Sequence, residues 1–458
     1  MTPHTRKIAI VGAGWAGMAA ALGAAQAGHA VTVFEAARTV GGRARAVAGQ
    51  CADGTPLMLD NGQHILIGAY AECLRLMAAV GVHEPAALLR MPLALTFADG
   101  TGLRLPDLPP PWDALLGIAR ARGWSWAERL ALLRTAAAWR LGGFGCAPDA
   151  TVAQLCAHLP ARLQAEFIDP LCVSALNTPA DRSSGRVFLR VLRDSLFSGR
   201  GGSNLLLPRV DLGALFPVPA MDWLRAHGHT VHLGRRVQTL RPLQPLHTLQ
   251  PLPGSGAETP RWQVDDDTFD AVVLATTSTE AARLAHGAAA ALPPGSAQAV
   301  ALASWAARAQ ALHFTAIATV YVRQPGAQGR LLAEPMVALR SQPGAPAQFV
   351  FDRHALGGPA GLLACVVSAF EGDRAALEAE VLQQAARQLG LPALELVQTV
   401  VEKRATFACV PGLRRPPMHP APDLALWACG DYIDGPYPAT LEGAVLSGTA
   451  VAQAAAAI

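Results

Sequence analysis

The pattern of hydrophobic and polar positions at the start of the chain predicts a strand, a helix and a second strand in close succession. Residues 8–11 (I-A-I-V) and 30–34 (A-V-T-V-F) are short apolar runs, which are typical of strands buried on both faces. Residues 15–27 between them are rich in alanine, the residue with the highest helix propensity. Such a unit places its two strands parallel in one sheet. We therefore expect a parallel sheet with helices packed on it.

The pattern changes between residues 85 and 200. Turns marked by Pro106 and by the prolines at 109–111 lead into helical stretches around 112–141, 151–169 and 185–197. We interpret this region as a helical insertion that covers a pocket.

Strands and helices alternate again after residue 215. We predict a helix near 219–227 and strands at 229–233, 235–240 and 271–275. Residues 241–260 interrupt this pattern with regularly spaced prolines, which neither donate in a strand ladder nor continue a helix. We expect a surface loop there, without a role in chemistry.

The last third of the chain predicts strands at 317–323 and 362–369, a helix at 374–389, and finally a strand, a glycine turn and an Ala-rich helix. A chain of 458 residues exceeds one ordinary core, so we expect two closely associated domains. The expected fold class is α/β, with a Rossmann-like dinucleotide-binding domain interleaved with an α+β substrate-binding domain. The first domain would comprise residues 1–84, 215–285 and 401–458, and the second a helical cap at 85–214 and a sheet at 286–400.

Composition narrows the classes of function. With 37 basic and 34 acidic residues the net charge is +3, too weak to hold a polyanion, so nucleic acid is not an expected partner. Hydrophobic residues make up 51% and the mean hydropathy is +0.26, but Gly, Pro or polar residues break every long uncharged run, and we expect no membrane-spanning helix. The eight cysteines have no C-x-x-C spacing, which predicts reduced thiols in a cytoplasmic protein and no metal site.

Residues 12–17 (G-A-G-W-A-G) follow the first predicted strand and open the predicted helix. Glu35 ends the second strand roughly 20 residues later, which completes the fingerprint of a dinucleotide-binding βαβ unit. The glycines permit a tight turn, a close approach to a pyrophosphate and helix packing, while Glu35 accepts hydrogen bonds from a ribose. The expected contacts from the glycine segment are Gly12, Gly14, Trp15, Ala16 and Gly17. Because this segment carries chemistry, we do not interpret it as a cleaved signal peptide, although Arg6 and Lys7 precede it.

Two further motifs resemble the amine oxidase and phytoene desaturase superfamily of flavoproteins, and this resemblance implies FAD rather than NAD. The first is Ala36 followed by Gly41, Gly42 and Arg43; Arg43 would face the phosphates, or else be a solvated loop charge. The second is Gly430-Asp431 near the C-terminus, where Asp431 would meet the ribityl and pyrophosphate portion, or else only cap a helix. The resemblance further implies contacts from the start of the last helix and from the backbone of Val237. The last-helix residues are Thr440, Leu441, Glu442, Gly443 and Ala444.

Longer stretches resemble the hydroxysqualene dehydroxylases of bacterial hopanoid synthesis, also called squalene-associated FAD-dependent desaturases. The matching segments are L-D-N-G-Q-H-I-L-I-G-A-Y (59–70), L-C-V-S-A-L-N-T-P-A-D (171–181), V-F-L-R-V-L-R-D-S-L-F (187–197), L-L-L-P-R-V-D-L-G-A-L-F (205–216) and C-G-D-Y-I-D-G-P-Y-P-A-T-L-E-G-A-V-L-S-G (429–448). The resemblance implies reductive loss of the hydroxyl of hydroxysqualene, an apolar C30 isoprenoid, and squalene-synthase-like pathway partners. The open alternatives are an oxidative desaturase of a carotenoid-type polyene, an amine oxidase, and a non-catalytic FAD-binding scaffold.

Such a reaction needs a proton donor. His64 is one candidate, and its alternative is a structural histidine that shapes the flavin pocket. Asp211 is the other, with a salt bridge to Arg209 or another arginine as its alternative. The resemblance also points to Asn177, Tyr432 and Tyr437 as polar groups, without ranking them.

Residues 112–139 contain four of the nine tryptophans, interleaved with arginines. This combination suits the headgroup region of a membrane, and it predicts peripheral contact with the inner face of the cytoplasmic membrane. The alternative is a helical cap with tryptophans in its core and arginines in solvent. The residues are Trp112, Trp124, Trp126, Trp139, Arg120, Arg122, Arg129, Arg134 and Arg140.

Overall fold

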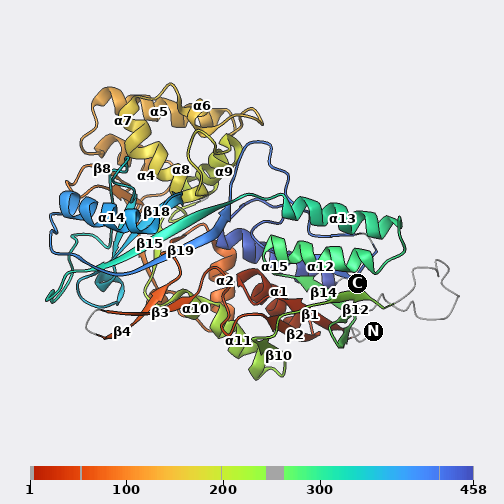
Figure 1. Ribbon diagram of the computed structural model, residues 1–458. Helices are drawn as coiled ribbons and strands as arrows, with labels where there is room; N and C mark the ends of the chain where they lie inside the picture. Colours follow the sequence, from red (N-terminus) through yellow and green to blue (C-terminus); the bar gives the residue numbers. More distant parts are fainter. Residues whose placement is uncertain (1–4, 52–53, 198, 244–261, 422, 457–458) are drawn as a thin grey trace.

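A five-stranded parallel sheet forms one end of the protein (Figure 1). The structure is a computed structural model, and it describes residues 5–51, 54–197, 199–243, 262–421 and 423–456. In spatial order its strands are β10 (Thr230–Leu233), β2 (Ala30–Glu35), β1 (Lys7–Val11), β14 (Ala271–Leu274) and β20 (Leu426–Ala428). The sheet therefore combines strands from the beginning, middle and end of the chain, as the interleaved arrangement requires.

Helices cover one face of this sheet, and their identities match the prediction. They are α1 (Trp15–Gln26), α11 (Pro217–Ala226) and α15 (Leu441–Ala456). Helices α1 and α15 pack side by side, because glycines let their backbones approach (Figure 1). A Cβ atom on Gly448 of α15 would lie 2.2 Å from the carbonyl oxygen of Ala16, and one on Gly23 would lie 2.7 Å from the Cβ of Ala452.

The other face packs against a small antiparallel sheet and a helical hairpin. These elements are β11 (Leu240–Pro242), β12 (Trp262–Val264), β13 (Asp267–Phe269), α12 (Ser278–Ala290) and α13 (Ala297–Gln310). Apolar residues of β1, β2 and β14 alternate between this face and the α1 face, so the sheet is buried on both sides.

The strand predicted at 235–240 is wrong except for Leu240. The amides of Gln238 and Thr239 donate to the carboxylate of Asp265, at 2.9 and 2.8 Å. The carbonyl oxygens of Val237 and Gln238 accept from Arg283, at 2.8 Å each. Side chains therefore satisfy the backbone groups that a neighbouring strand would have bound. Of the Pro-rich loop predicted at 241–260, residues 244–260 lie outside the described residues.

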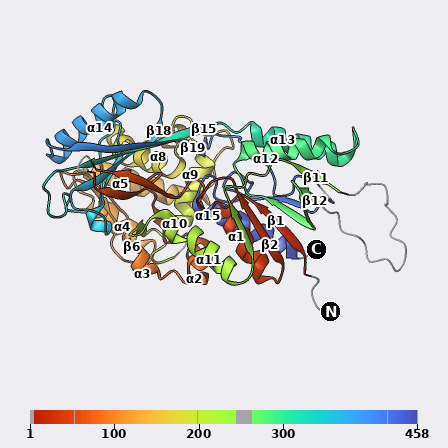
Figure 2. The same ribbon diagram turned by 60° about the horizontal axis from the view of Figure 1, so that its bottom comes forward.

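A second five-stranded sheet, entirely antiparallel, belongs to the other half of the molecule. Its order is β16 (Met336–Ala338), β17 (Phe349–Asp352), β18 (Leu362–Phe370), β15 (Phe314–Arg323) and β19 (Glu395–Phe407). Helix α14 (Arg374–Leu389) covers its outer face (Figure 2). Strands β15 and β18 and helix α14 confirm three predicted elements.

Helices of the predicted insertion lie above this sheet (Figure 1). Short strands that the sequence pattern did not indicate precede and follow these helices in the chain. The helices are α4 (Trp112–Arg120), α5 (Trp126–Leu141), α6 (Val152–Cys156), α7 (Ala161–Leu163), a π-helix (Gln164–Ile168), α8 (Asp169–Leu176) and α9 (Gly185–Leu196). The short strands are β5 (Leu66–Ile67), β6 (Leu88–Met91), β7 (Ala94–Thr96), β8 (Gly102–Arg104) and β9 (Leu205–Pro208). The remaining elements of the structure are β3 (Ala46–Gln50), β4 (Pro56–Asp60), α2 (Ala71–Ala79), α3 (Glu84–Ala87), α10 (Leu212–Leu215) and a 3₁₀ turn (His354–Leu356). In the part of the chain described, no helix is long and apolar enough to cross a membrane.

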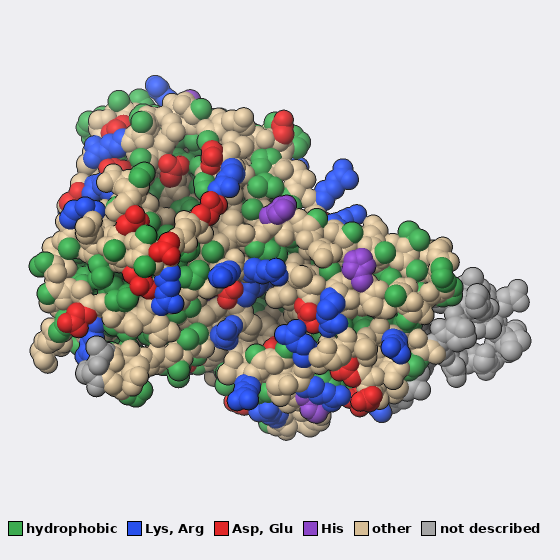
Figure 3. All heavy atoms as spheres, viewed as in Figure 1, with side chains coloured by type: hydrophobic (Ala, Val, Ile, Leu, Met, Phe, Trp, Pro, Cys, Tyr) green, Lys and Arg blue, Asp and Glu red, His purple; other side chains and the backbone are tan. Residues whose placement is uncertain are grey.

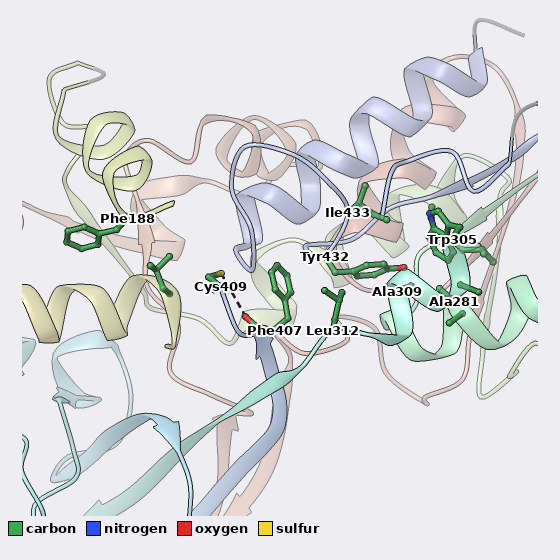
Figure 4. Close-up of a cluster of buried hydrophobic side chains, with 14 of the residues drawn as sticks. Phe188, Ala281, Trp305, Ala309, Leu312, Phe407, Cys409, Tyr432 and Ile433 are labelled. Atoms are coloured by element: carbon green, nitrogen blue, oxygen red, sulfur yellow. Dashed lines mark hydrogen bonds between the residues drawn. The ribbon is translucent and has the colours of Figure 1, made fainter. Parts of the chain in front are cut away.

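A buried hydrophobic cluster joins the two halves (Figure 4). Phe188 comes from α9, Phe407 from the end of β19 and Trp305 from α13. Tyr432 lies between them at 1% exposure, and its hydroxyl has no hydrogen-bond partner among the described residues. Tyr432 is therefore a core residue here, rather than a polar group of the site.

Candidate active site

A cavity of about 770 Å³ runs from the edge of the parallel sheet into the other half of the molecule. Both expected glycine motifs, Glu35 and the start of α15 line one part of it. The antiparallel sheet and the cap helices line the other part. Of the residues that the sequence predicted as dinucleotide contacts, all but Gly17 and Gly443 line this one continuous space.

The two glycine motifs lie against each other. Gly12 has φ +112°, and a Cβ atom there would lie 2.5 Å from the carbonyl oxygen of Ala275. Gly41 has φ +108°, its amide donates to the carbonyl of Ala13 at 2.9 Å, and Gly14 and Gly41 form an isolated parallel bridge. Only glycine adopts these conformations without strain. The result is an open cradle at the N-terminus of α1, which suits a pyrophosphate.

Glu35 lies at the end of β2, and its carboxylate holds the glycine loop in place. Its two carboxylate oxygens accept from the amides of Ala13 and Ala37, at 2.8 Å each. A carboxylate offers about four acceptor positions, so two remain for ribose hydroxyls. Glu35 therefore orders the glycine loop in addition to its predicted contact with the dinucleotide.

Arg43 connects the motif at residue 41 to the one at residue 430. Its guanidinium forms an ion pair with Asp431 and donates to the carbonyl of Ala405 at 2.9 Å. Both side chains line the cavity. Arg43 is thus anchored, and not a freely solvated loop charge; its predicted contact with the phosphates stays a prediction.

The start of α15 is shaped by its own residues. The hydroxyl of Thr440 accepts from the amide of Gly443 at 2.9 Å, and a Cβ on Gly443 would lie 1.9 Å from the carbonyl oxygen of Tyr437. Glu442 lines the cavity, but its carboxylate accepts from the amides of Glu72 and Cys73, at 2.9 Å each. Glu442 therefore secures the first turn of α2 against α15.

The remaining part of the cavity is apolar. Aliphatic and aromatic side chains from the antiparallel sheet face it, as do others from the cap helices and the short strands. They include Ile317, Met336, Phe349, Phe351 and Val366 from the sheet, and Leu103, Leu105, Ile118, Phe167, Val191 and Leu192 from the other elements. A long hydrocarbon suits this lining, because burying apolar surface yields about 25 cal/mol per Å².

Comparison of the sequence and the structure with known proteins shows which family the chain belongs to. Residues 15–456 match the family described as flavin containing amine oxidoreductase. The chain belongs to this family. It is 27% identical to the hydroxysqualene dehydroxylase of Rhodopseudomonas palustris, over 98% of each chain. It is 28% identical to the hydroxysqualene dehydroxylase of Zymomonas mobilis, over 50% of this chain and 54% of that protein.

An oxidoreductase of known structure from Methanosarcina mazei has the same fold, with a TM-score of 0.69 at 17% identity, covering 98% of this chain and 100% of that one. The predicted fold class, a Rossmann-like FAD-binding domain with an interleaved second domain, is confirmed. As a member of the flavin containing amine oxidoreductase family, the protein is an FAD-dependent oxidoreductase. The glycine cradle suits the pyrophosphate of FAD, and the remaining acceptor positions of Glu35 suit its adenosine ribose.

His64 is one of the two predicted proton donors, and it lines the cavity. Its Nδ1 lies 2.7 Å from the carbonyl oxygen of Gly62, so Nδ1 carries the hydrogen and the neutral ring presents Nε2 as an acceptor. Burial lowers the pKa of His64, the bond to Gly62 raises it and the charge of Arg43 lowers it, with a net decrease. His64 is therefore mostly neutral near pH 7.

Asp211, the other predicted donor, is not among the described residues that line the cavity. Its carboxylate caps α10 by accepting from the amide of Ala214 at 3.0 Å. Asp60 lies nearby and is 1% exposed, with Oδ1 accepting from the amide of Leu212 at 2.9 Å and Oδ2 3.9 Å from Arg353. Burial raises the pKa of Asp60 to about 6. The geometry does not favour Asp211 as a donor.

Sequence reasoning missed a polar group at the cavity wall. Asp194 of α9 pairs with Arg193 at 2.6 Å and with Arg190 at 3.3 Å, and it accepts a hydrogen bond from Tyr437. Asp194 and Tyr437 both line the cavity. Burial and the bond to Asp194 raise the pKa of Tyr437 above its ordinary value. Asp194 follows Arg190 by four residues on α9, a spacing that is typical of an ion pair on a solvated helix face, so no local pattern indicated a residue of the cavity.

Asn177 is the third polar residue to which the resemblance pointed, and its side chain connects a helix to the antiparallel sheet by hydrogen bonds. Its side-chain amide donates to the hydroxyls of Thr315 and Thr406, at 2.9 Å each, while its oxygen accepts from the amide of Ala369. It thereby ties α8 to three strands of the antiparallel sheet.

Proposed function

We propose that the protein removes the hydroxyl group of hydroxysqualene to give squalene, with reduced FAD as the reductant. The observation that carries this proposal is the similarity over 98% of both chains to a hydroxysqualene dehydroxylase, which includes the substrate half. The apolar cavity that is continuous with the cofactor cradle supports it, because a C30 isoprenoid needs such a lining. The product leaves as squalene and water, and the flavin is left oxidised.

Bound FAD in its reduced form supplies the hydride, and the chain must supply the rest. Loss of an allylic hydroxyl as water needs one proton, and the hydride then fills the vacated position on carbon. The apolar wall excludes bulk water, so few groups compete for the electron-deficient carbon. The proton must therefore come from a side chain that lines the cavity.

Two lining residues are candidates for that proton. His64 gives a proton from Nε2 only when its ring is charged, and its lowered pKa makes the charged ring scarce above pH 6.5. Tyr437 keeps its hydroxyl proton at neutral pH, as an ordinary tyrosine does, and burial beside Asp194 raises its pKa further. Arg190 lies 5.9 Å from the Tyr437 ring centroid and favours its phenolate once the proton is given.

The pH dependence of single-turnover flavin oxidation separates the two candidates. Donation by His64 predicts a rate that falls as the pH rises through its lowered pKa, and His64→Ala would remove this dependence. Donation by Tyr437 predicts a rate that persists into the alkaline range, and a loss of about 100-fold or more in Tyr437→Phe. Asp211→Asn should leave the rate unchanged, as the matched acidic control outside the cavity.

The function is tested by the direction of electron flow. Protein reduced under anaerobic conditions and mixed with hydroxysqualene should regain the spectrum of oxidised flavin as squalene appears, whereas squalene itself should cause no change. A desaturase or an amine oxidase would instead bleach in its oxidised form when given a polyene or an amine. A scaffold would show no redox turnover with any of them. Reduced protein that leaves hydroxysqualene untouched would overturn the proposal.

The proposed substrate also defines the neighbouring steps. Hydroxysqualene must come from an enzyme that joins isoprenoid chains, so squalene-synthase-like proteins are the expected pathway partners. We propose a cytoplasmic location, in keeping with the expectation of reduced thiols; the eight cysteines carry no disulfide in the structure.

A further inference from the structure

We propose that α4 and α5 dock on an anionic lipid bilayer, and that α4 is the wall between this bilayer and the substrate cavity. The docking surface consists of Leu108, Trp112, Leu115, Trp126 and Leu130 with the surrounding arginines. The second part of the proposal, the passage of substrate beside α4, rests on the proposed function. The first part does not.

Exposed apolar side chains concentrate on this part of the molecule. Among the described residues, eleven large hydrophobic side chains are exposed, and six of them lie between residues 108 and 141. Trp112 is 62% exposed and Trp126 is 74% exposed. Because α4 and α5 pack against each other, their exposed side chains belong to one end of the molecule. A concentration of this kind marks an interaction surface, whereas single exposed residues do not.

The four tryptophans of this region divide into two pairs. Trp124 is buried and donates to Glu166 at 3.2 Å, and Trp139 packs edge-on against Phe188 with ring centroids 6.4 Å apart. These two have the structural role that the alternative interpretation gave to all four. Trp112 and Trp126 have no such role, and their amphipathic rings suit the interface of a bilayer.

The charge of this surface favours anionic lipid over a neutral partner. Arg120, Arg122, Arg134 and Arg140 are exposed, and none of them forms an ion pair with a described residue. Hydrophobic, basic and some acidic side chains are interspersed at the upper end of the molecule, over the helices labelled α5 and α7 in Figure 1 (Figure 3). Each basic residue near an anionic membrane contributes about 1 kcal/mol of attraction.

The acidic side chains of α4 and α5 do not neutralise these arginines, because they are buried or hydrogen-bonded. Asp113 is buried at 3% exposure, and Glu128 accepts from the amide of Ser125 in the capping box of α5. Arg129 stacks on Trp126 at 4.7 Å and donates to the carbonyls of Ala119 and Ala121, which holds this ring in place. The surface therefore combines fixed apolar side chains with unpaired positive charge.

Helix α4 has two apolar faces. Trp112 and Leu115 are exposed on the outside, while Ala114 and Ile118, four residues apart, line the substrate cavity. Only the width of one helix, about 10 Å with its side chains, separates the two. A hydrocarbon that leaves the bilayer beside α4 thus reaches the cavity without crossing water.

The test uses the FAD-loaded protein and vesicles of phosphatidylcholine, with or without one-third phosphatidylglycerol. The parent protein should float with the anionic vesicles. Trp112→Ala/Trp126→Ala should lower the partition coefficient at least tenfold, and Arg120→Gln/Arg134→Gln should weaken it mainly on anionic vesicles. Val300→Ser, which removes a side chain that is 59% exposed on α13, is the matched control and should float like the parent.

A parent protein that stays wholly soluble with anionic vesicles would overturn docking, as would tryptophan variants that float unchanged. Concentration-dependent dimerisation that the tryptophan variants abolish, without vesicle binding, would assign the surface to a second copy instead. Substrate passage is tested separately: the tryptophan variant should turn over hydroxysqualene slowly from vesicles and at the parent rate from detergent micelles. Floating protein that turns over no hydroxysqualene from either would leave docking intact and refute the proposed function.

Discussion

Replacement of Glu35 should weaken FAD binding by about ten- to a hundredfold. In Glu35→Ala the ribose loses a charged acceptor, which is worth about 1.5–3 kcal/mol. The amide of Ala13, now held at 2.8 Å by this carboxylate, loses its acceptor as well, so the glycine cradle is less ordered before FAD arrives. The loss should therefore lie toward the upper end of that range. Glu35→Gln keeps the size and one acceptor, and should fall between the parent and Glu35→Ala.

The measurement is a titration of flavin-free protein with FAD, followed by the quenching of flavin fluorescence. Asp373→Ala is the matched control, because Asp373 also accepts from two backbone amides, those of Ala375 and Ala376 at 2.8 and 3.0 Å, but at the start of α14. Both variants should lose a similar amount of stability, on the order of 1–3 kcal/mol, because each loses two backbone amide hydrogen bonds to a carboxylate. Equal FAD affinity in the two variants would show that Glu35 has only a structural role.

Three further predictions concern the cofactor and stability. Acid precipitation should release the flavin into the supernatant, because the motifs offer contacts and no evident attachment site; colour in the pellet would mean a covalent link. Gly448→Ala should destabilise the protein by about 1–3 kcal/mol and weaken FAD retention, because the added Cβ would lie 2.2 Å from the carbonyl oxygen of Ala16. The control is Gly287→Ala on α12, where no atom lies within 4 Å of the added Cβ. In thermal denaturation this control should be neutral or slightly stabilising. The folded-state pKa of Asp60, about 6, lies above its unfolded value of 3.8, so this group should lower the free energy of unfolding by about 3 kcal/mol in all as the pH rises from below 3.8 to above 6. The free energy of unfolding from denaturant titrations should therefore fall less steeply with pH in Asp60→Asn than in the parent, and equal pH dependence would contradict a buried carboxyl.

The sequence predicted the cofactor half well because its signals are local. A short apolar strand, glycines at fixed spacing and an acid at the next strand end all lie within residues 8–35, and they require one geometry. The second glycine motif and the cofactor contacts at the start of the last helix were inferred by resemblance, and the structure places both on the same cavity.

The substrate half was harder to predict, because its strands pair and its helices pack through contacts between segments that are distant in the sequence. β19 pairs with β15 across more than seventy residues and contains the polar stretch from Glu402 to Arg404, so its alternation is weak. Helix α13 is almost uniformly rich in alanine, which leaves little contrast between its faces. The role of Asp194 depends on Tyr437, which is distant in sequence, and no local pattern indicates that pair.

The parallel sheet has a consequence for how the protein is made. Its central strand β1 is synthesised first, but β14 gains its outer neighbour only when β20 has been made, and α1 packs on α15 later still. A nascent chain therefore cannot close the cofactor site on the ribosome until α15 has emerged. Until then the apolar faces of β1 and α1 need protection, and folding should be slow because its decisive contacts span more than four hundred residues. FAD should accordingly bind only after α15 has been made and has packed on α1.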